Sequence, residues 1–400
     1  MIPDAQLQAH AVAALVAFAE VLPPALRGAW DRFQERAPIT NAAPPGYFLH
    51  PLALPVLQLP AWVGEALARA GRPVPEARVR AAVCAAAFGY AHVRAQDDWL
   101  DEGRGDGAEV MLLSEALMVE HMAWLSAVTP MRGAFRKEVA RRWRGYQEAM
   151  LVERAVHAGH RPLDAEAEAV LRGRSMPMLL PAAGLFYPAP SQGDKGAARY
   201  ADARRPEASN LTEAPESVGA EGPERRTSER GRESWTDGGQ CEAERGGPQD
   251  AARRAVRRSG PTEPGGRRGV VSGDDVASST STARPPSSLP TLVAALVDAH
   301  QLALDLGDAD DDLAAGRASL ALARLGDPPD RAALMRALYV EGGFDRILDE
   351  AIARLADARR AAIDLDLTGA LDFIAAREAR AQATRARVLG AFFAHIAKKG

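Results

Sequence analysis

Apolar residues recur at intervals of three and four along most of the chain, which is the period of an amphipathic helix. Val12, Leu15 and Phe18 form one such stripe near the N-terminus. Alternating runs rich in Val, Ile and Thr, which would predict strands, do not occur. The pattern therefore predicts an all-α protein, with helices over 5–21, 61–71, 76–101, 108–127, 131–158, 165–186, 290–314, 329–358 and 368–397. Proline pairs such as Pro23–Pro24 are expected to break the N-terminal part into short pieces.

The composition changes in the middle of the chain, over 191–289. Gly, Pro, Ser, Arg and Glu dominate there, and only about eight residues of 191–290 are Val, Leu, Ile, Met, Phe or Trp. Such a segment buries too little apolar surface to offset the entropy of ordering it. We therefore expect a disordered low-complexity insertion, or a frameshifted stretch, that divides one helical domain into an N-terminal part, 1–190, and a C-terminal part, 290–400.

Composition excludes several classes of protein. The chain has 400 residues, 47% of them hydrophobic, which is enough for a sizeable core. A formal net charge of -4 does not indicate a nucleic-acid-binding protein, and two cysteines are too few for a disulfide scaffold. No basic segment opens the chain as in a signal peptide, and no run of about 18 apolar residues indicates a membrane span. We expect a soluble cytoplasmic protein that binds no nucleic acid.

Two acidic clusters follow apolar runs that are typical of buried helices. Asp97, Asp98 and Asp101 form a DDxxD pattern after the run AAVCAAAFGY. On a helix, positions 97 and 101 share a face, and position 98 lies about 100° away. Because the helix dipole already favours cations at a C-terminal end, carboxylates gathered there call for a positive partner.

The second cluster lies in the stretch HQLALDLGDADDDLAAGR, which also follows an apolar run. Asp305, Asp308 and Asp312 stand at i, i+3 and i+7, so they share one helix face. Two such clusters facing each other would form an oxygen-rich site. Mg²⁺ takes carboxylate and water oxygens and completes its shell with substrate phosphates. The two clusters therefore predict a site that binds Mg²⁺, with more than one ion.

These motifs resemble the class I isoprenoid synthases: the trans-prenyl diphosphate synthases, the squalene/phytoene synthases and the terpene cyclases. The DDxxD acids match the first aspartate-rich motif of that superfamily. The second motif matches in the form Q-x-x-x-D-x-x-D-x-x-x-D-x-x-x-G-R, from Gln301 to Arg317. The segment GRSMPMLLPAAGL, from Gly173, resembles the helix that precedes the second motif. The resemblance covers roughly 76–186 and 290–397.

The resemblance implies a fold and an activity. It implies a helical bundle around a central cavity, with both motifs holding Mg²⁺ against a prenyl diphosphate substrate. The function expected first is an enzyme that ionises an allylic prenyl diphosphate and transfers the prenyl group. A terpene cyclase of the same fold, with intramolecular capture, is the first alternative. A non-catalytic protein that binds a prenyl diphosphate or a protein partner is the second, and a homodimer is a possible assembly.

Three departures from the superfamily pattern keep these alternatives open. Leu304 stands where many members have Asp or Asn. Arg104 is alone after the first motif, where chain-elongating synthases have an arginine pair. No match to the element that binds isopentenyl diphosphate is found. These departures argue against ordinary chain elongation and favour a divergent bacterial-type member.

Further site residues follow from the expected chemistry. A leaving diphosphate needs cationic partners, and the candidates are Arg317, Arg174 and Arg94. A carbocation needs a dry cavity with aromatic faces. The residues expected to line that cavity or to support the acids are Tyr90, His92, Val93, Gln96 and Gln301. Of these, His92 and Val93 resemble the chain-length-setting positions of the superfamily.

Overall fold

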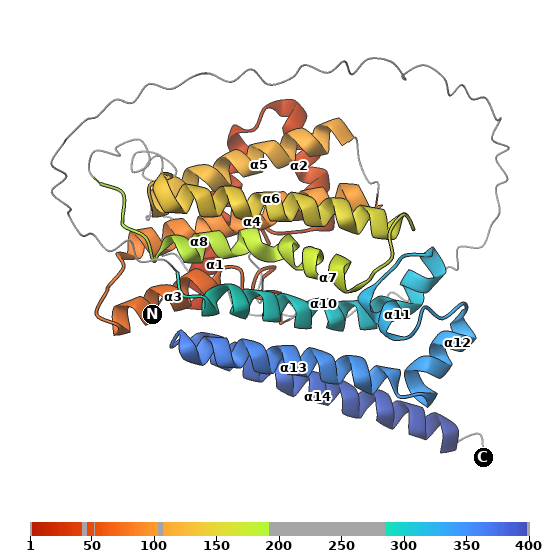
Figure 1. The fold of residues 1–400 in the computed structure, drawn as a ribbon. Helices are drawn as coiled ribbons and strands as arrows, with labels where there is room; N and C mark the ends of the chain where they lie inside the picture. Colours follow the sequence, from red (N-terminus) through yellow and green to blue (C-terminus); the bar gives the residue numbers. More distant parts are fainter. Residues whose placement is uncertain (1, 42–45, 52, 103–106, 192–284, 398–400) are drawn as a thin grey trace, which may run out of the picture. The chain divides into compact units, whose positions relative to one another are not determined.

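The computed structural model describes residues 2–41, 46–51, 53–102, 107–191 and 285–397. In these ranges the chain consists of helices joined by turns and loops and contains no strand, so the all-α prediction is confirmed (Figure 1). The helices belong to one compact unit, formed by Met1–Thr212 and Ser281–Gly400. A second unit, Glu213–Thr280, lies outside the described residues, as does most of the predicted insertion 191–289.

Two helices open the compact unit, α1 (Asp4–Val21) and α2 (Pro24–Arg36). The sequence pattern predicts no helix over 24–36, and this is wrong. A proline in the first turn of a helix removes no intrahelical hydrogen bond, and its fixed φ angle suits the helix, so Pro24 starts α2 instead of preventing it. The helix is held by burial of Trp30, whose ring contacts that of Phe18 edge to face at 5.5 Å.

Helix α4 (Glu76–Glu102) carries the first acidic motif and packs most extensively along α5 (Gly107–Val128). Small residues allow this close contact. A Cβ atom at Gly89 would lie 2.7 Å from the Nδ1 atom of His121, so only glycine fits there without a shift. Alanines over 81–87 are fully buried as well. Most of α4 is therefore core, which leaves its C-terminal end to serve a polar site. Its N-terminal neighbour α3 (Gln58–Arg69) covers part of the same core.

The chain after α6 (Gly133–His157) forms three short segments, where the sequence predicts one helix over 165–186. They are α7 (Ala165–Leu171), the 3-10 helix η1 (Arg172–Leu179) and α8 (Leu180–Gly184). The prediction of a continuous helix is wrong because Pro177 lies inside η1 and has no N–H to donate to a helical carbonyl.

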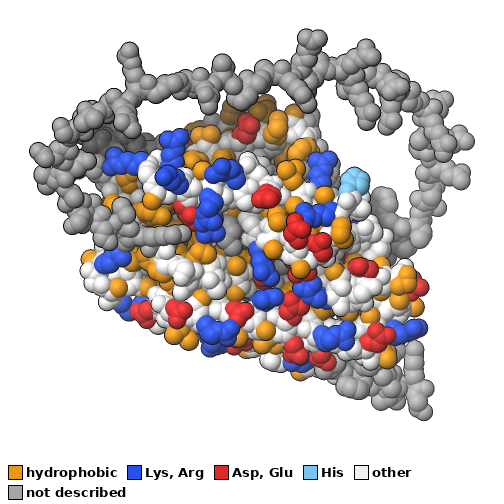
Figure 2. Space-filling model, viewed as in Figure 1, with side chains coloured by type: hydrophobic (Ala, Val, Ile, Leu, Met, Phe, Trp, Pro, Cys, Tyr) orange, Lys and Arg blue, Asp and Glu red, His pale blue; other side chains and the backbone are white. Residues whose placement is uncertain are grey.

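Helix α10 (Ser288–Ala315) carries the second acidic motif. It packs against η1 on one side and against α13 (Gly343–Asp364) on the other (Figure 1). The last helix, α14 (Thr368–Ala397), packs against α13 and also contacts α3. This arrangement lets one helix, α10, face two different environments, and Figure 2 shows acidic and basic side chains interleaved where α10 and α13 lie.

The predicted helix over 329–358 is interrupted, so this prediction is wrong in its continuity. The segment consists of α12 (Arg331–Met335), a π-helical turn η3 (Arg336–Val340) and then α13. Gly342 adopts a φ of +71°, which side chains disfavour, and this turn separates η3 from α13. A further short helix that the pattern does not predict, α11 (Leu320–Arg324), follows α10.

Two of these helices, α5 and α10, are long and apolar enough to cross a membrane when judged by length and composition alone. The most apolar window of each is about half buried in the compact unit, at 44% and 50%. A core helix of a soluble protein meets the same criterion, so the expectation of no membrane span stays a prediction.

Candidate functional site

A pocket of about 370 Å³ opens along the face of α10 that carries the second acidic motif. Asp305, Asp308 and Asp312 all line it, as their spacing predicts for one helix face. Helix α4 contributes Asp97 to the same pocket. The fold therefore brings an acid of the first motif together with three acids of the second. The predicted residues Arg94, Arg174, Gln301 and Arg317 also line this pocket.

The other two acids of the first motif are placed only in part. Asp98 and Asp101 belong to α4, but their side chains lie outside the described residues. Their predicted role in metal binding therefore stays a prediction.

The C-terminal end of α10 is shaped by the Gly-Arg pair that follows the acids. Gly316 adopts a φ of +65° and ends the helix with a left-handed turn. This turn folds Arg317 back onto α10, where its backbone N–H donates to the carbonyl of Asp312 at 2.8 Å. The Arg317 Nε atom also donates to Asp312 Oδ1 at 2.9 Å. The pair thus sets a guanidinium at the edge of the acidic face.

Asp305 and Asp308 differ in their surroundings. Asp305 is buried, and its carboxylate accepts hydrogen bonds from the Gln301 side chain and from the backbone N–H of Leu320, the latter at 2.7 Å. Burial nevertheless raises the pKa of Asp305. Asp308 is exposed to the pocket and forms no hydrogen bond or ion pair with another described residue. Its pKa is raised by partial burial and then by the charges of Asp312 and Asp311.

The pocket also holds a nearly buried carboxylate that pairs with one of the predicted arginines. Glu153 of α6 is 8% exposed and accepts a hydrogen bond from Arg174 of η1. Arg174 is thereby held at the pocket wall. Its charge partly opposes the rise that burial causes in the pKa of Asp305. A bound anion would have to compete with Glu153 for this guanidinium.

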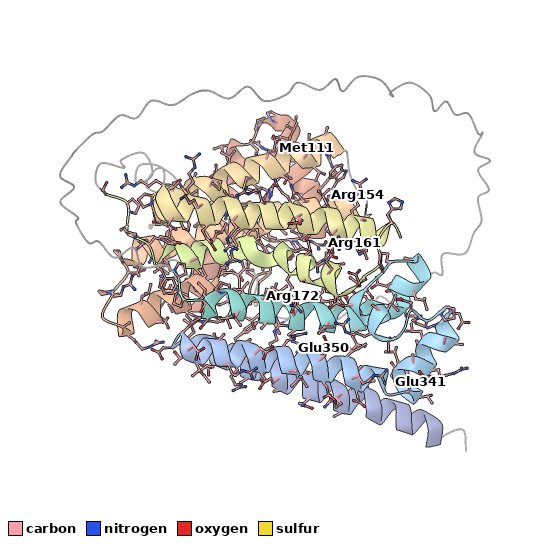
Figure 3. All side chains as sticks on the ribbon, in the orientation of Figure 1. Met111, Arg154, Arg161, Arg172, Glu341 and Glu350 are labelled. Atoms are coloured by element: carbon pink, nitrogen blue, oxygen red, sulfur yellow. The ribbon has the colours of Figure 1, made fainter. Side chains whose placement is uncertain are left out.

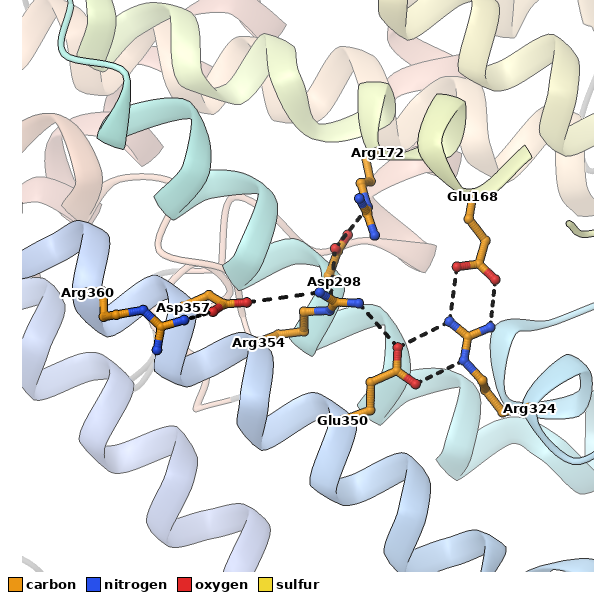
Figure 4. A network of polar contacts seen from close by, with 8 residues as sticks. All are labelled: Glu168, Arg172, Asp298, Arg324, Glu350, Arg354, Asp357 and Arg360. Atoms are coloured by element: carbon orange, nitrogen blue, oxygen red, sulfur yellow. Dashed lines mark hydrogen bonds and ion pairs between the residues drawn. The ribbon is translucent and has the colours of Figure 1, made fainter. Parts of the chain in front are cut away.

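A network of ion pairs closes the pocket between α7, α11 and α13 (Figure 4). Arg324 of α11 is its centre. Its Nη1 atom donates to Glu168 Oε1 of α7 at 2.6 Å, and its Nε atom donates to Glu350 Oε2 of α13 at 2.9 Å. The hydrogen bond from Arg324 lowers the pKa of Glu350. One side chain thus joins three segments that are far apart in the sequence.

The network continues across α10 through Asp298. Its Oδ2 atom lies 3.1 Å from Arg172 Nε of η1 and 3.9 Å from Arg354 Nε of α13. Burial raises the pKa of Asp298, and the two arginines oppose that shift. Arg172 and Glu350 lie on elements to either side of α10 (Figure 3). These contacts fix α10 between its two neighbours.

Sequence reasoning does not find this network. One signal was available: Asp298 is the single acid in the apolar run TLVAALVDAH, and such an acid requires a partner. Its partners come from η1 and α13, however, and no spacing in the sequence brings those elements together.

Four of the predicted cavity residues lie elsewhere in the described structure and do not line this pocket. The Tyr90 hydroxyl lies 3.0 Å from that of Tyr47, and its ring contacts Phe48, so an N-terminal loop covers this face of α4. His92 is buried towards α5 with its Nδ1 atom 2.8 Å from the Ser114 carbonyl oxygen.

The remaining two are Gln96 and Val93. The Gln96 Oε1 atom accepts a hydrogen bond from the hydroxyl of Tyr146 at 2.7 Å. Val93 is half-buried on α4. The roles of all four in a substrate cavity stay predictions.

The pocket offers carboxylate oxygens, which are the ligand type that Mg²⁺ prefers, but the described side chains do not form a complete coordination sphere. Among the described side chains, no three of His, Cys, Asp and Glu already stand as a group that would hold a metal ion. Mg²⁺ does not need such a cage, because it keeps several waters and binds through one or two carboxylates plus substrate phosphates. The carboxylates of Asp97 and Asp308 are of the required type.

Comparison of the chain with protein-family models, with curated proteins and with solved structures gives no match.

The ion-pair network yields a prediction about stability. Arg324→Gln leaves Glu168 and Glu350 facing each other in a half-buried site. We expect the free energy of unfolding to fall by about 2 kcal/mol, between the values typical of exposed and of buried pairs. Urea denaturation measures it. The control is Arg331→Gln, which removes an exposed pair with Asp310 and should cost less than about 0.5 kcal/mol. Equal losses in the two variants would contradict the central place of Arg324.

The electrostatics of the acidic face yield a second prediction. Because the pKa of Asp308 is raised in the folded protein, its ionised form costs stability above the ordinary carboxyl pKa of 3.8. Asp308→Asn should therefore raise the free energy of unfolding at pH 7, and the gain should shrink as the pH falls towards 3.8. Denaturation in EDTA at the two pH values measures this. Asp310→Asn, whose carboxylate pairs with Arg331, should give no gain. A gain for Asp308→Asn that is equal at both pH values would refute the electrostatic explanation.

Proposed function

We propose that this protein is a Mg²⁺-dependent enzyme that ionises an allylic prenyl diphosphate and transfers the prenyl group. The observation that carries the proposal is one pocket lined by Asp97 of α4 and by Asp305, Asp308 and Asp312 of α10. Arginines stand beside these acids. A pocket with both charges suits a metal–diphosphate group better than it suits either a bare cation or a bare anion.

The reaction begins with breakage of the bond between the allylic carbon and the diphosphate oxygen. The electron pair leaves with the diphosphate, and an allylic carbocation remains until a nucleophile captures it. Bound Mg²⁺ would neutralise the negative charge that develops on the leaving diphosphate. Asp97 and Asp308 are the residues that would hold it, because both line the pocket with carboxylate oxygens. Both carboxylate oxygens of Asp305 already accept hydrogen bonds, one from the Gln301 side chain and one from the Leu320 backbone N–H. We therefore do not assign Asp305 to the metal.

The arginines would bind and orient the diphosphate. Arg317 is half-exposed at the edge of the pocket and keeps the Asp312 carboxylate in place. Arg174 is held by Glu153, and Arg94 lies on α4 one turn before Asp97. Guanidinium groups offer several N–H donors to phosphate oxygens in a fixed geometry. Such donors stabilise charge as it develops on the leaving group.

The test is to remove one acid from each motif. Asp97→Ala and Asp308→Ala should each slow the release of diphosphate by roughly 100-fold or more, which corresponds to about 3 kcal/mol of transition-state stabilisation. The measurement uses purified protein, saturating Mg²⁺ and C10, C15 and C20 allylic diphosphates. A coupled or longer diphosphate product identifies a prenyltransferase, and a hydrocarbon or alcohol product identifies a cyclase.

Asp310→Ala is the matched control. Asp310 lies in the same acidic run, but it pairs with Arg331 at 2.8 Å and does not line the pocket. This variant should keep near-normal activity. If Asp310→Ala is as damaging as Asp308→Ala, the acidic face is not the metal-binding face. If the protein binds the diphosphates and releases none, it is a binding protein and the proposed activity is wrong.

A further inference from the structure

A second pocket, of about 400 Å³, lies on the opposite side of α10 from the acids. Helices α10, α13 and α14 enclose it together with η3 and Leu54. Ala299, Ala303 and Leu306 come from α10, at helical positions that point away from the face of Asp305 and Asp308. The two pockets therefore share the helices α10 and α13 but none of their lining residues.

The walls of this second pocket are mainly apolar. Leu348 and Leu355 of α13 and Phe373 of α14 form much of them, and Phe344 and Leu338 continue the apolar surface at the η3 end. A volume of about 400 Å³ falls within the range typical of ligand pockets. An apolar pocket of this size is suited to a hydrocarbon chain.

The polar part of the wall is cationic. Arg377, Arg380 and Arg387 line the pocket along one face of α14, with Thr384 between them, at i, i+3, i+7 and i+10. No Asp or Glu belongs to the described wall. His300 also lines the pocket, and its pKa is lowered to about 4 by burial and by Arg377, so it is neutral at pH 7.

The three arginines differ in what already holds them. Arg377 is half-buried, donates to the carbonyl of Ala53 and lies with its guanidinium 5.0 Å from the centroid of the Phe373 ring. Arg380 and Arg387 are exposed, and neither forms an ion pair or hydrogen bond with another described residue. Two guanidinium groups are therefore available at the rim of an apolar pocket. Because no carboxylate of the wall offsets them, an anion would meet an uncompensated charge.

We propose that this second pocket binds an amphipathic anion. The apolar chain of such a ligand would occupy the space between α10, α13 and α14. Its carboxylate, sulfate or phosphate head would lie against Arg380 and Arg387, where bidentate hydrogen bonds from guanidinium are favourable. The proposal does not depend on the proposed function, because the pocket contains none of the residues assigned to metal or diphosphate binding.

The experiment uses the full chain in EDTA and dodecanoate as the probe, with affinity measured by calorimetry. Arg380→Glu/Arg387→Glu should weaken binding at least tenfold, and so should Ala303→Trp, which fills the pocket from an exposed position of α10. Dodecyltrimethylammonium and dodecanol, which carry the same chain without the negative charge, should bind at least tenfold more weakly than dodecanoate.

The charge-matched control is Arg136→Glu/Lys137→Glu, which makes the same change of net charge on exposed positions of α6. It should bind dodecanoate as the unaltered protein does, and so should Asp308→Ala. Equal affinity of the Arg380/Arg387 variant, equal weakening in the α6 control or equal binding of the cationic amphiphile would overturn the proposal.

A sedimentation assay with phosphatidylglycerol vesicles identifies the source of the ligand. Vesicle binding that depends on Arg380 and Arg387 indicates a membrane lipid, and the absence of vesicle binding indicates a free amphiphile.

Discussion

Helix α10 is largely buried, yet it carries carboxylates, and a buried carboxylate is costly unless it is paired. The elements around α10 supply the groups that pair with these carboxylates. Asp298, Asp305 and Asp312 each form an ion pair or a hydrogen bond with a residue of another segment or of a neighbouring turn. Asp298 meets Arg172 and Arg354, and Asp312 meets Arg317. The partners come from η1, α13 and the turn after α10, so the same ion pairs that offset the charges also fix the position of the helix.

Asp308 is the acid of α10 that lines the pocket without a hydrogen bond or ion pair to another described residue. Asp308 shares the pocket with partnered acids yet contacts no described group of opposite charge at hydrogen-bonding distance. Partial burial, and then the charges of Asp312 and Asp311, raise the pKa of Asp308. The fold thus pairs Asp298, Asp305 and Asp312 and leaves the carboxylate of Asp308 open to the pocket, where the proposed Mg²⁺ would bind. The same reasoning applies on the other side of α10, where unpaired arginines border an apolar pocket.

The sequence predicts the helical class and the acidic face of α10 because both depend on local periodicity. Asp305, Asp308 and Asp312 must share a face on any helix, and the apolar residues before them must be buried somewhere. It fails where a residue's role depends on a distant segment. The contacts of Tyr90 with Tyr47 and Phe48 and of His92 with Ser114 join segments that no spacing in the sequence brings together. The partners of Arg324 lie more than twenty residues away in both directions.

The most direct test of the central claim is thermal melting with Mg²⁺ and inorganic diphosphate, alone and together. If the carboxylates of Asp97 and Asp308 hold Mg²⁺ against a diphosphate, binding to the folded state raises the melting temperature by mass action. Both ligands together should raise the melting temperature by more than the sum of their separate effects. A melting temperature unchanged by millimolar Mg²⁺ with saturating diphosphate would contradict it, and the acids would then be a solvated polar face.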